Sequence, residues 1–134
     1  MSAATRIVAG ANAGAARERA TRERVDVWQV ALGPHVSDAD QATLNDSERA
    51  FAARLRVGRV EWVAARAALR RVLGRYLGLG PGQVALDEGA NGKPRLAPGG
   101  GADLRFNLSH SGDLALIAVR LGHEVGVDVE ALRP

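Results

Sequence analysis

The chain has 134 residues, enough for one domain with a core, and it has no cysteine, which excludes disulfides, thiolate catalysis and cysteine-ligated zinc. Lys93 is the only lysine, and the net charge of +3 allows an anionic ligand without favouring a nucleic-acid partner. No apolar run approaches the roughly 20 residues that cross a bilayer, and no secretory signal is recognisable, so we expect a cytoplasmic protein without a membrane partner.

The first 24 residues mix alanine, glycine, arginine and glutamate without a sustained apolar period. Such a segment buries little surface against the entropy cost of ordering it. We therefore expect a disordered tail over residues 1–24 and one folded unit over residues 25–134. The β-branched residues of 25–32 predict the first strand, which ends at Gly33 and Pro34.

Two helices are predicted next. Asn45 is a residue type that caps helix N-termini, and it predicts a helix that runs towards Leu55. After a break at Gly58, apolar residues at three- and four-residue spacings predict a longer helix over residues 60–77. Gly78 then provides the stop.

The second half of the chain has short apolar runs separated by turn residues, a pattern typical of strands. Strands are predicted over residues 84–86, 104–108, 114–120 and 125–129. Asn91-Gly92 predicts a turn, and the three glycines of 99–101 predict a flexible or tightly bent link. The order of elements predicts an α+β fold, with helices packed on one face of a mostly antiparallel sheet.

Two carboxylates occur close together near residue 130, in the run Val125-Gly126-Val127-Asp128-Val129-Glu130. The side-chain period of a strand places Asp128 and Glu130 on the same face. Like charges this close repel unless a cation neutralises them, and Mg²⁺, which prefers oxygen ligands, is suited to that role. The alternative interpretation is a solvent-facing pair on an edge strand.

Small polar residues follow the strand predicted over 104–108. Ser109, His110 and Ser111, followed by Gly112, offer hydroxyl, imidazole and turn N–H donors that suit a phosphate group. A nucleophilic Ser–His pair is a competing hypothesis, but no positioned acid is identifiable. An ordinary hairpin turn with polar caps is the other alternative.

Two cations are candidates for binding an anion. Lys93 follows the predicted turn and precedes Pro94, and Arg66 lies on the long predicted helix among alanines that leave room for a ligand. Each has a simpler interpretation, namely a solvated charge on a loop or on a helix surface.

Three segments, taken in this order, resemble motifs of the surfactin-synthetase type of 4'-phosphopantetheinyl transferases: Asn91-Gly92-Lys93-Pro94, Phe106-Asn107-Leu108-Ser109-His110-Ser111-Gly112 and Gly126-Val127-Asp128-Val129-Glu130. The helix segment around Arg66 is also similar to the coenzyme A contact helix of that family. The resemblance covers roughly residues 44–133.

The resemblance implies an enzyme that transfers the 4'-phosphopantetheine arm of coenzyme A to a serine of an apo acyl or peptidyl carrier protein. It implies that Asp128 and Glu130 hold Mg²⁺ and act as the catalytic carboxylates. By the same resemblance, the coenzyme-binding residues are Arg66, Ser109 and His110 at the 3'-phosphate, Arg49 as a helper, and Lys93 and Pro94 beside the adenine.

The resemblance stops at the N-terminal half of such enzymes. Family members have two similar subdomains, and the second carries a Trp-x-x-Lys-Glu motif that supplies a further metal carboxylate and a lysine. That motif does not occur in this chain. Three explanations are therefore open: an excised or truncated piece, a partner chain that supplies the second half, or a non-catalytic module that binds coenzyme A or a carrier protein. A homodimer is less suitable, because a second copy repeats the same carboxylates.

Overall fold

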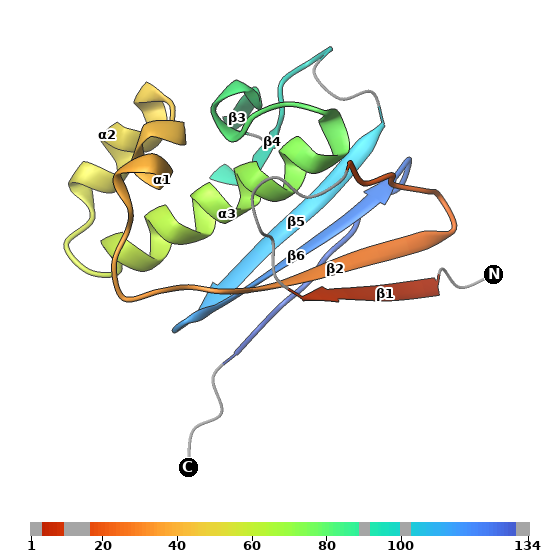
Figure 1. The fold of residues 1–134 in the computed structure, drawn as a ribbon, viewed down its shortest axis with the longest axis horizontal. Helices are drawn as coiled ribbons and strands as arrows, with labels where there is room; N and C mark the ends of the chain where they lie inside the picture. Colours follow the sequence, from red (N-terminus) through yellow and green to blue (C-terminus); the bar gives the residue numbers. More distant parts are fainter. Residues whose placement is uncertain (1–3, 10–16, 89–91, 100–102, 131–134) are drawn as a thin grey trace.

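The computed structural model describes residues 4–9, 17–88, 92–99 and 103–130. Its main sheet has the strand order β1-β2-β6-β5 (Figure 1). β1 is parallel to β2 and the other two pairings are antiparallel; the strands are β1 (Ala4–Ala9), β2 (Arg24–Ala31), β5 (Leu104–Ser111) and β6 (Leu114–Leu121). The predicted α+β fold with a mostly antiparallel sheet is therefore confirmed.

Three helices lie on one face of this sheet (Figure 1), namely α1 (Asp38–Thr43), α2 (Asp46–Arg54) and α3 (Arg59–Leu77). α2 begins at the predicted cap: Asn45 Oδ1 accepts from the Glu48 N–H, and Glu48 Oε1 accepts from the Asn45 N–H. α3 ends at the predicted Gly78, whose φ of +69° is the left-handed conformation that glycine adopts without strain. α1 was not predicted.

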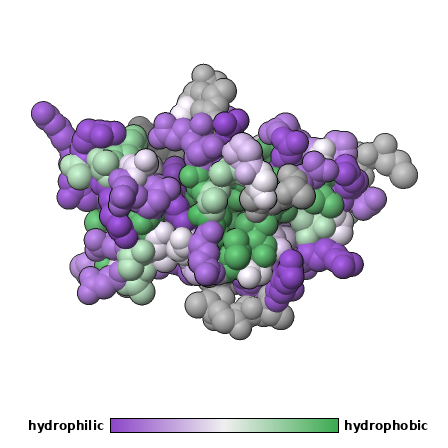
Figure 2. All heavy atoms as spheres, turned by 90° about the horizontal axis from the view of Figure 1, so that it is seen from above, coloured by the Kyte–Doolittle hydropathy of each residue, from purple (hydrophilic) through white to green (hydrophobic). Residues whose placement is uncertain are grey.

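The core fills the space between α3 and the sheet. One face of α3 is apolar, and the alternating residues of β2 and β6 meet it. The largest fully buried apolar side chains of this core are Trp28, Leu69, Val72, Leu73, Ile117 and Val119. Seen from above, hydrophilic side chains surround a group of apolar ones near the centre of the molecule (Figure 2).

A second, two-stranded sheet consists of β3 (Leu86–Glu88) and β4 (Pro94–Leu96), which are antiparallel. The 3-10 turn η1 (Pro81–Gln83) connects it to the end of α3. The strand predicted over 84–86 therefore begins at Leu86 instead. Of the predicted turn, Asn91 lies outside the described residues, whereas Gly92 has a φ of +72°. Residues 100 and 101 of the predicted glycine link also lie outside them.

The prediction of a disordered tail is wrong for the described residues before β2. Residues 4–9 form β1, and the Glu18 N–H donates to the Arg75 carbonyl at 3.0 Å, so this segment lies against the end of α3. The ordering comes from ion pairs with distant residues. Arg6 Nη2 lies 2.9 Å from Glu18 Oε2 and 3.0 Å from Asp26 Oδ2, a contact that local composition does not reveal.

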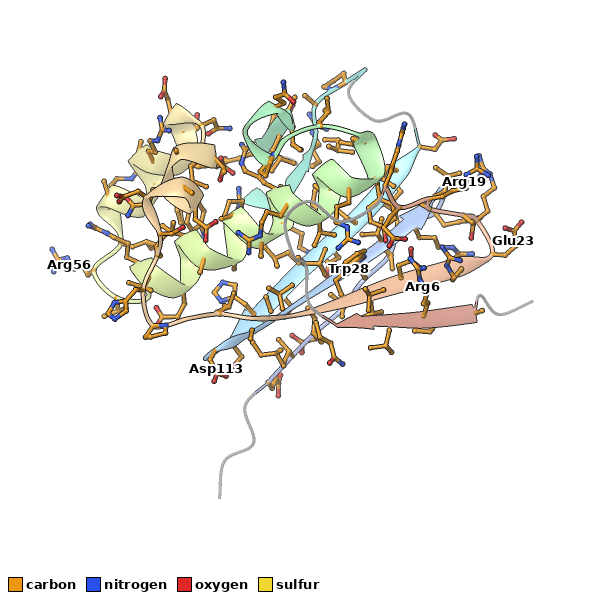
Figure 3. All side chains as sticks on the ribbon, viewed as in Figure 1. Arg6, Arg19, Glu23, Trp28, Arg56 and Asp113 are labelled. Atoms are coloured by element: carbon orange, nitrogen blue, oxygen red, sulfur yellow. The ribbon has the colours of Figure 1, made fainter. Side chains whose placement is uncertain are left out.

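Asp26 is a buried carboxylate that joins β1, β2 and α3. It accepts from Arg6 Nε at 3.0 Å, from Arg24 Nε at 2.6 Å and from the Tyr76 hydroxyl at 2.7 Å. Tyr76 in turn accepts from Trp28 Nε1 at 2.7 Å. Arg6 and Trp28 lie on the same side of the sheet (Figure 3). This network satisfies a charge that would be costly to bury alone.

Candidate coenzyme-binding clefts and carboxylate segment

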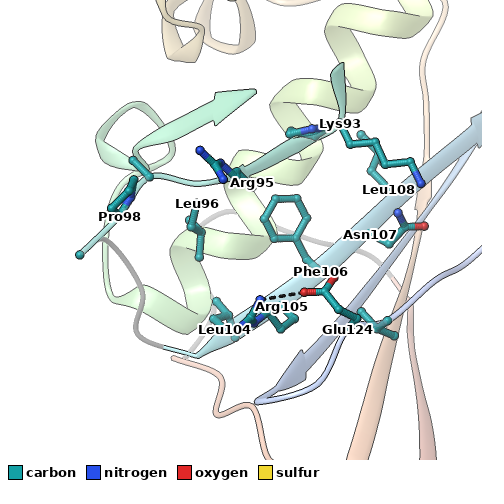
Figure 4. A pocket seen from close by; sticks show the side chains of 14 residues that line it. Lys93, Arg95, Leu96, Pro98, Leu104, Arg105, Phe106, Asn107, Leu108 and Glu124 are labelled. Carbon is teal, nitrogen blue, oxygen red and sulfur yellow. Dashed lines mark hydrogen bonds and ion pairs between the residues drawn. The ribbon is translucent and has the colours of Figure 1, made fainter. Parts of the chain in front are cut away.

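A cleft of about 540 Å³ lies between β4 and β5. Lys93, Pro94, Phe106, Asn107 and Glu124 contribute to its lining. In Figure 4, Phe106 is central, with Lys93 and Asn107 towards one end and Glu124 towards the other. The cleft therefore combines an apolar ring with a cation and an amide, which suits a planar ligand that carries negative charge.

The charges around this cleft differ in how far they are neutralised. Arg95 Nε lies 2.7 Å from Asp87 Oδ1, and Arg105 Nη1 lies 2.7 Å from Glu124 Oε1. Lys93 forms no ion pair with any of the described residues. Lys93 is therefore the positively charged side chain at this cleft that is most available to bind an anionic group.

The segment that carries the two carboxylates is extended but forms no backbone ladder, so the strand predicted over 125–129 is wrong. Residues 124–130 have no strand partner among the described residues. The predicted alternation is nevertheless present, because Val127 and Val129 are half-buried while Asp128 and Glu130 are exposed. The reason for the wrong prediction is that a period of two identifies an extended chain, not its partner.

Side chains of β5 hold this segment. The Val127 N–H donates to Asn107 Oδ1 at 2.9 Å, and the Val129 N–H donates to Ser109 Oγ at 3.2 Å. The Ser109 hydroxyl also donates to Asp128 Oδ1 at 3.2 Å. Ser109 is therefore in direct contact with one of the predicted metal-binding carboxylates.

A second cleft, of about 490 Å³, lies between α2, the start of α3 and β3. Phe51, Trp62, Arg66, Glu88 and Gly92 are among its lining residues. The rings of Phe51 and Trp62 lie 4.7 Å apart between centroids. The two clefts adjoin each other, because Gly92 lines one and the next residue in the chain, Lys93, lines the other.

Arg66 is less open to a ligand than the surrounding alanines suggested. Its Nη1 lies 3.2 Å from Glu48 Oε2, and its guanidinium carbon lies 4.6 Å from the centroid of the Trp62 ring. Burial lowers the pKa of the Arg66 guanidinium, and the charge of Glu48 partly opposes this effect. Glu48 also pairs with Arg70, so one carboxylate faces two guanidinium groups, while Asp87 and Glu88 add further negative charge to the lining of this cleft.

The other predicted phosphate contacts are not gathered at one point. Leu108 packs on the core, so the strand period places His110 on the helix side of β5 and Ser109 on the opposite side. Arg49 donates to the Ala42 carbonyl at 3.3 Å and is half-exposed. It lines neither of the two clefts.

The donor set of Asp128 and Glu130 fits Mg²⁺. That ion takes oxygen ligands, keeps several waters, and commonly uses one or two protein carboxylates together with phosphates of the substrate. Both side chains are exposed on the same side of an extended segment. Among the described residues, no group of three or more histidine, aspartate or glutamate side chains is close enough to hold a metal ion.

Sequence reasoning missed three residues at the site. Asn107 was quoted only as part of a motif, although it alternates with core residues in the same way as Ser109. Glu48 and Arg70 were not identified, because a charge pattern on a helix does not reveal which charges become buried. The spacing of Arg66 and Arg70, one helical turn apart, was the available signal that both could face the same partner.

Every helix in the described part of the chain is too short or too polar to cross a membrane.

The chain matches no family model. It is 42% identical over 120 residues to the 4'-phosphopantetheinyl transferase HetI of Nostoc sp., an alignment that covers 84% of this chain and 49% of the relative. It is 39% identical over 108 residues to the 4'-phosphopantetheinyl transferase AcpT of Salmonella typhimurium, covering 81% and 50%.

A third relative is a putative 4'-phosphopantetheinyl transferase of Synechocystis sp., at 33% identity over 96 residues, which covers 70% of this chain and 39% of the relative. The chain is therefore related to 4'-phosphopantetheinyl transferases. It spans about half the length of these HetI and AcpT relatives.

Proposed function

We propose that this relative of the 4'-phosphopantetheinyl transferases provides the coenzyme A-binding half of an enzyme of the surfactin-synthetase type. The complete enzyme would transfer the phosphopantetheine arm of coenzyme A to a serine of an apo acyl or peptidyl carrier protein. The observation that carries this proposal is the placement of Lys93, Phe106 and Asn107 around one cleft, with the segment of Asp128 and Glu130 tied to the same strand, β5.

The cleft between β4 and β5 is proposed to bind the nucleotide part of coenzyme A. Phe106 offers a ring against which adenine can stack, and Pro94 offers a further apolar surface beside it. The ammonium group of Lys93 supplies positive charge for a phosphate group. Loss of these contacts would weaken coenzyme binding more than the chemical step, since they position the substrate and do not touch the reacting atoms.

The 3'-phosphate is proposed to bind in the direction of the second cleft. Arg66 lines that cleft and is the cation proposed to bind the phosphate there. His110 and Ser109 remain proposed contacts of this phosphate, each from its own face of β5. Arg49 would contribute through long-range attraction only, because it lines neither cleft.

Asp128 and Glu130 are proposed to hold Mg²⁺, which supplies charge neutralisation at the pyrophosphate of coenzyme A. The role of the chain's own residues is to present two carboxylates together from one side of a fixed segment. A second chain, which carries the remaining part of the active site, is proposed as the partner that completes the enzyme in the cytoplasm.

The proposal is tested by the intact mass of an apo carrier protein incubated with this chain, coenzyme A and Mg²⁺, together with isothermal titration of coenzyme A. We expect the chain to bind coenzyme A in an Mg²⁺-dependent manner and to transfer the arm only when a second half is added. Asp128→Asn should abolish the Mg²⁺ dependence. Asp113→Asn, at the exposed turn labelled in Figure 3, is the matched control and should retain it.

Three outcomes are informative. Transfer by the chain alone would show that it completes its own active site and would refute the half-enzyme proposal. Coenzyme binding that no added second half converts into transfer would favour a non-catalytic binding module. Failure to bind coenzyme A with or without Mg²⁺ would refute the proposed function as a whole.

A further inference from the structure

We propose that Asn107 is a positioning residue, which sets the direction of the Asp128 and Glu130 carboxylates by holding the backbone that carries them. This inference rests on the proposed function for its chemical purpose, but the tether itself is a feature of this chain. Asn107 forms no hydrogen bond with the carboxylate of Asp128 or Glu130 in the described part of the chain. Its side-chain oxygen instead accepts the Val127 N–H at 2.9 Å.

The face of β5 on which Asn107 lies is the face turned away from α3. Leu104 is buried in the core, and Phe106 and Leu108 pack against it. The strand period therefore directs Asn107 and Ser109 to the opposite face of the sheet. This is the face along which residues 124–129 run, in the same direction as β5 (Figure 1).

The burial of a sheet residue next to Asn107 also indicates that residues 124–129 run across this face of the sheet. Ala118 is the β6 partner of Asn107, and it lies on the same face of the sheet. It has no exposed surface, although it does not belong to the core beneath the helices. An alanine on an uncovered sheet face would remain partly exposed, so the segment that Asn107 holds provides its cover.

The geometry of an extended chain explains why two tethers are sufficient. N–H groups two residues apart point in the same direction, and side chains alternate between the two sides. Hydrogen bonds at Val127 and Val129 together fix the rotation of the segment about its own axis. Once that rotation is fixed, Asp128 and Glu130 share one side. A slip of one residue would turn them away from it.

Asn107 is the clearer of the two tethers to test. Ser109 bonds both the Val129 N–H and the Asp128 carboxylate, so its substitution would change the carboxylate directly. Asn107 acts on the carboxylates only through the main chain of their segment, although it also lines the proposed coenzyme cleft. A third connection, between Arg105 and Glu124, joins two exposed side chains and should contribute little.

The first experiment is amide hydrogen exchange by NMR on the chain without ligand. Asn107→Leu removes the acceptor at similar size, and we expect exchange at Val127 to accelerate about tenfold, as the loss of one hydrogen bond implies. Asn107→Asp keeps an acceptor oxygen and should retain the protection. Arg105→Gln is the matched control on the same strand face and should also leave it unchanged.

The second experiment measures binding of Mn²⁺, as a probe for Mg²⁺, without coenzyme A, because Asn107 also lines the proposed coenzyme cleft. Asn107→Leu should weaken Mn²⁺ binding about tenfold, the size of effect expected when a residue that orients a metal ligand is lost. Unchanged Mn²⁺ affinity, or unchanged exchange at Val127, would overturn the positioning role. If the unmodified chain binds no Mn²⁺, the proposed metal site fails, whereas amide exchange still decides whether Asn107 holds the segment.

Discussion

Glu48 and Arg70 form an ion pair inside the protein, with 2.6 Å between Glu48 Oε1 and Arg70 Nη2 and almost no exposed surface on either residue. Arg70 also donates to the carbonyls of Pro81 and Val84, and Glu48 caps α2. The pair therefore connects α2, α3 and the segment that leads to the second sheet. Its consequences can be tested without any ligand.

The first prediction concerns this pair. Glu48→Ala should lower the free energy of unfolding by about 3–5 kcal/mol, because it leaves Arg70 charged and buried without a carboxylate. Denaturation in urea measures the effect. The double substitution Glu48→Gln with Arg70→Met should recover part of the loss. A loss for Glu48→Ala below about 1 kcal/mol, typical of an exposed pair, would contradict the buried arrangement.

The second prediction concerns Tyr76, the only tyrosine of the chain. Burial, together with the hydrogen bond to Asp26, raises the pKa of the Tyr76 hydroxyl above its ordinary value of about 10. The folded state thus keeps this proton more strongly than the unfolded state. Its contribution to stability is complete below about pH 10 and is lost as the pH rises towards the folded-state pKa.

Urea denaturation over a series of alkaline pH values tests this behaviour. In the unmodified protein, the free energy of unfolding should fall above about pH 10. Tyr76→Phe should remove this component of the fall and should cost about 1–3 kcal/mol near neutral pH, because Trp28 and Asp26 each lose a hydrogen-bond partner. An identical alkaline dependence in both proteins would count against the buried hydroxyl.

The third prediction sets helix propensity against packing at Gly74. Alanine favours a helix by about 1 kcal/mol over glycine. A Cβ at this position would nevertheless collide with the main-chain carbonyl oxygen of Leu79, whose N–H donates to the Gly74 carbonyl at 3.0 Å. Gly74→Ala should therefore destabilise the protein by about 1–3 kcal/mol.

The matched control for that substitution is Gly82→Ala. A Cβ there would meet the main chain of Thr43 at 3.8 Å, an ordinary van der Waals distance. Its effect should stay within about 0.5 kcal/mol. Thermal denaturation of both variants decides the matter, and a more stable Gly74→Ala protein would show that the turn after α3 can move aside.

The fourth prediction addresses the proposed coenzyme cleft. Lys93→Met should weaken coenzyme A binding about tenfold at low salt, because it removes a charge-assisted contact to phosphate, and the difference should shrink as salt is added. Arg56→Met removes the same charge from the exposed residue at the edge of the molecule in Figure 3 and should change the affinity little. Isothermal titration measures both; equal effects would indicate nonspecific attraction only.

The regular elements of the core could be read from the sequence because their signals are local. The Asn45 cap, the Gly78 stop and the apolar period of α3 are set by neighbouring residues, and each is confirmed. β1 could not be read in this way. β1 is held in place by the ion pair between Arg6 and Asp26, and these two residues are far apart in the sequence.

In the candidate site, too, the features set by neighbouring residues could be predicted, and those set by distant contacts could not. The alternation that exposes Asp128 and Glu130 was visible in the sequence, whereas the tethers from Asn107 and Ser109 were not. Arg66 was expected to be open to an anion, but its packing against Trp62 and Glu48 depends on the approach of α2 to α3. The roles proposed for Lys93, Pro94 and His110 stay predictions.

The antiparallel pairing of β2 with β6 has a consequence for how the molecule is made. Trp28, on an early strand, is the sheet partner of Ile117, which the ribosome adds much later than Trp28. During synthesis β2 and the apolar face of α3 therefore lack β6, whose residues share their core, whereas the local structure of α3 can already form. Because such distant contacts close late, the sheet should be the slow step in folding, and β2 the segment most in need of protection from aggregation until β6 arrives.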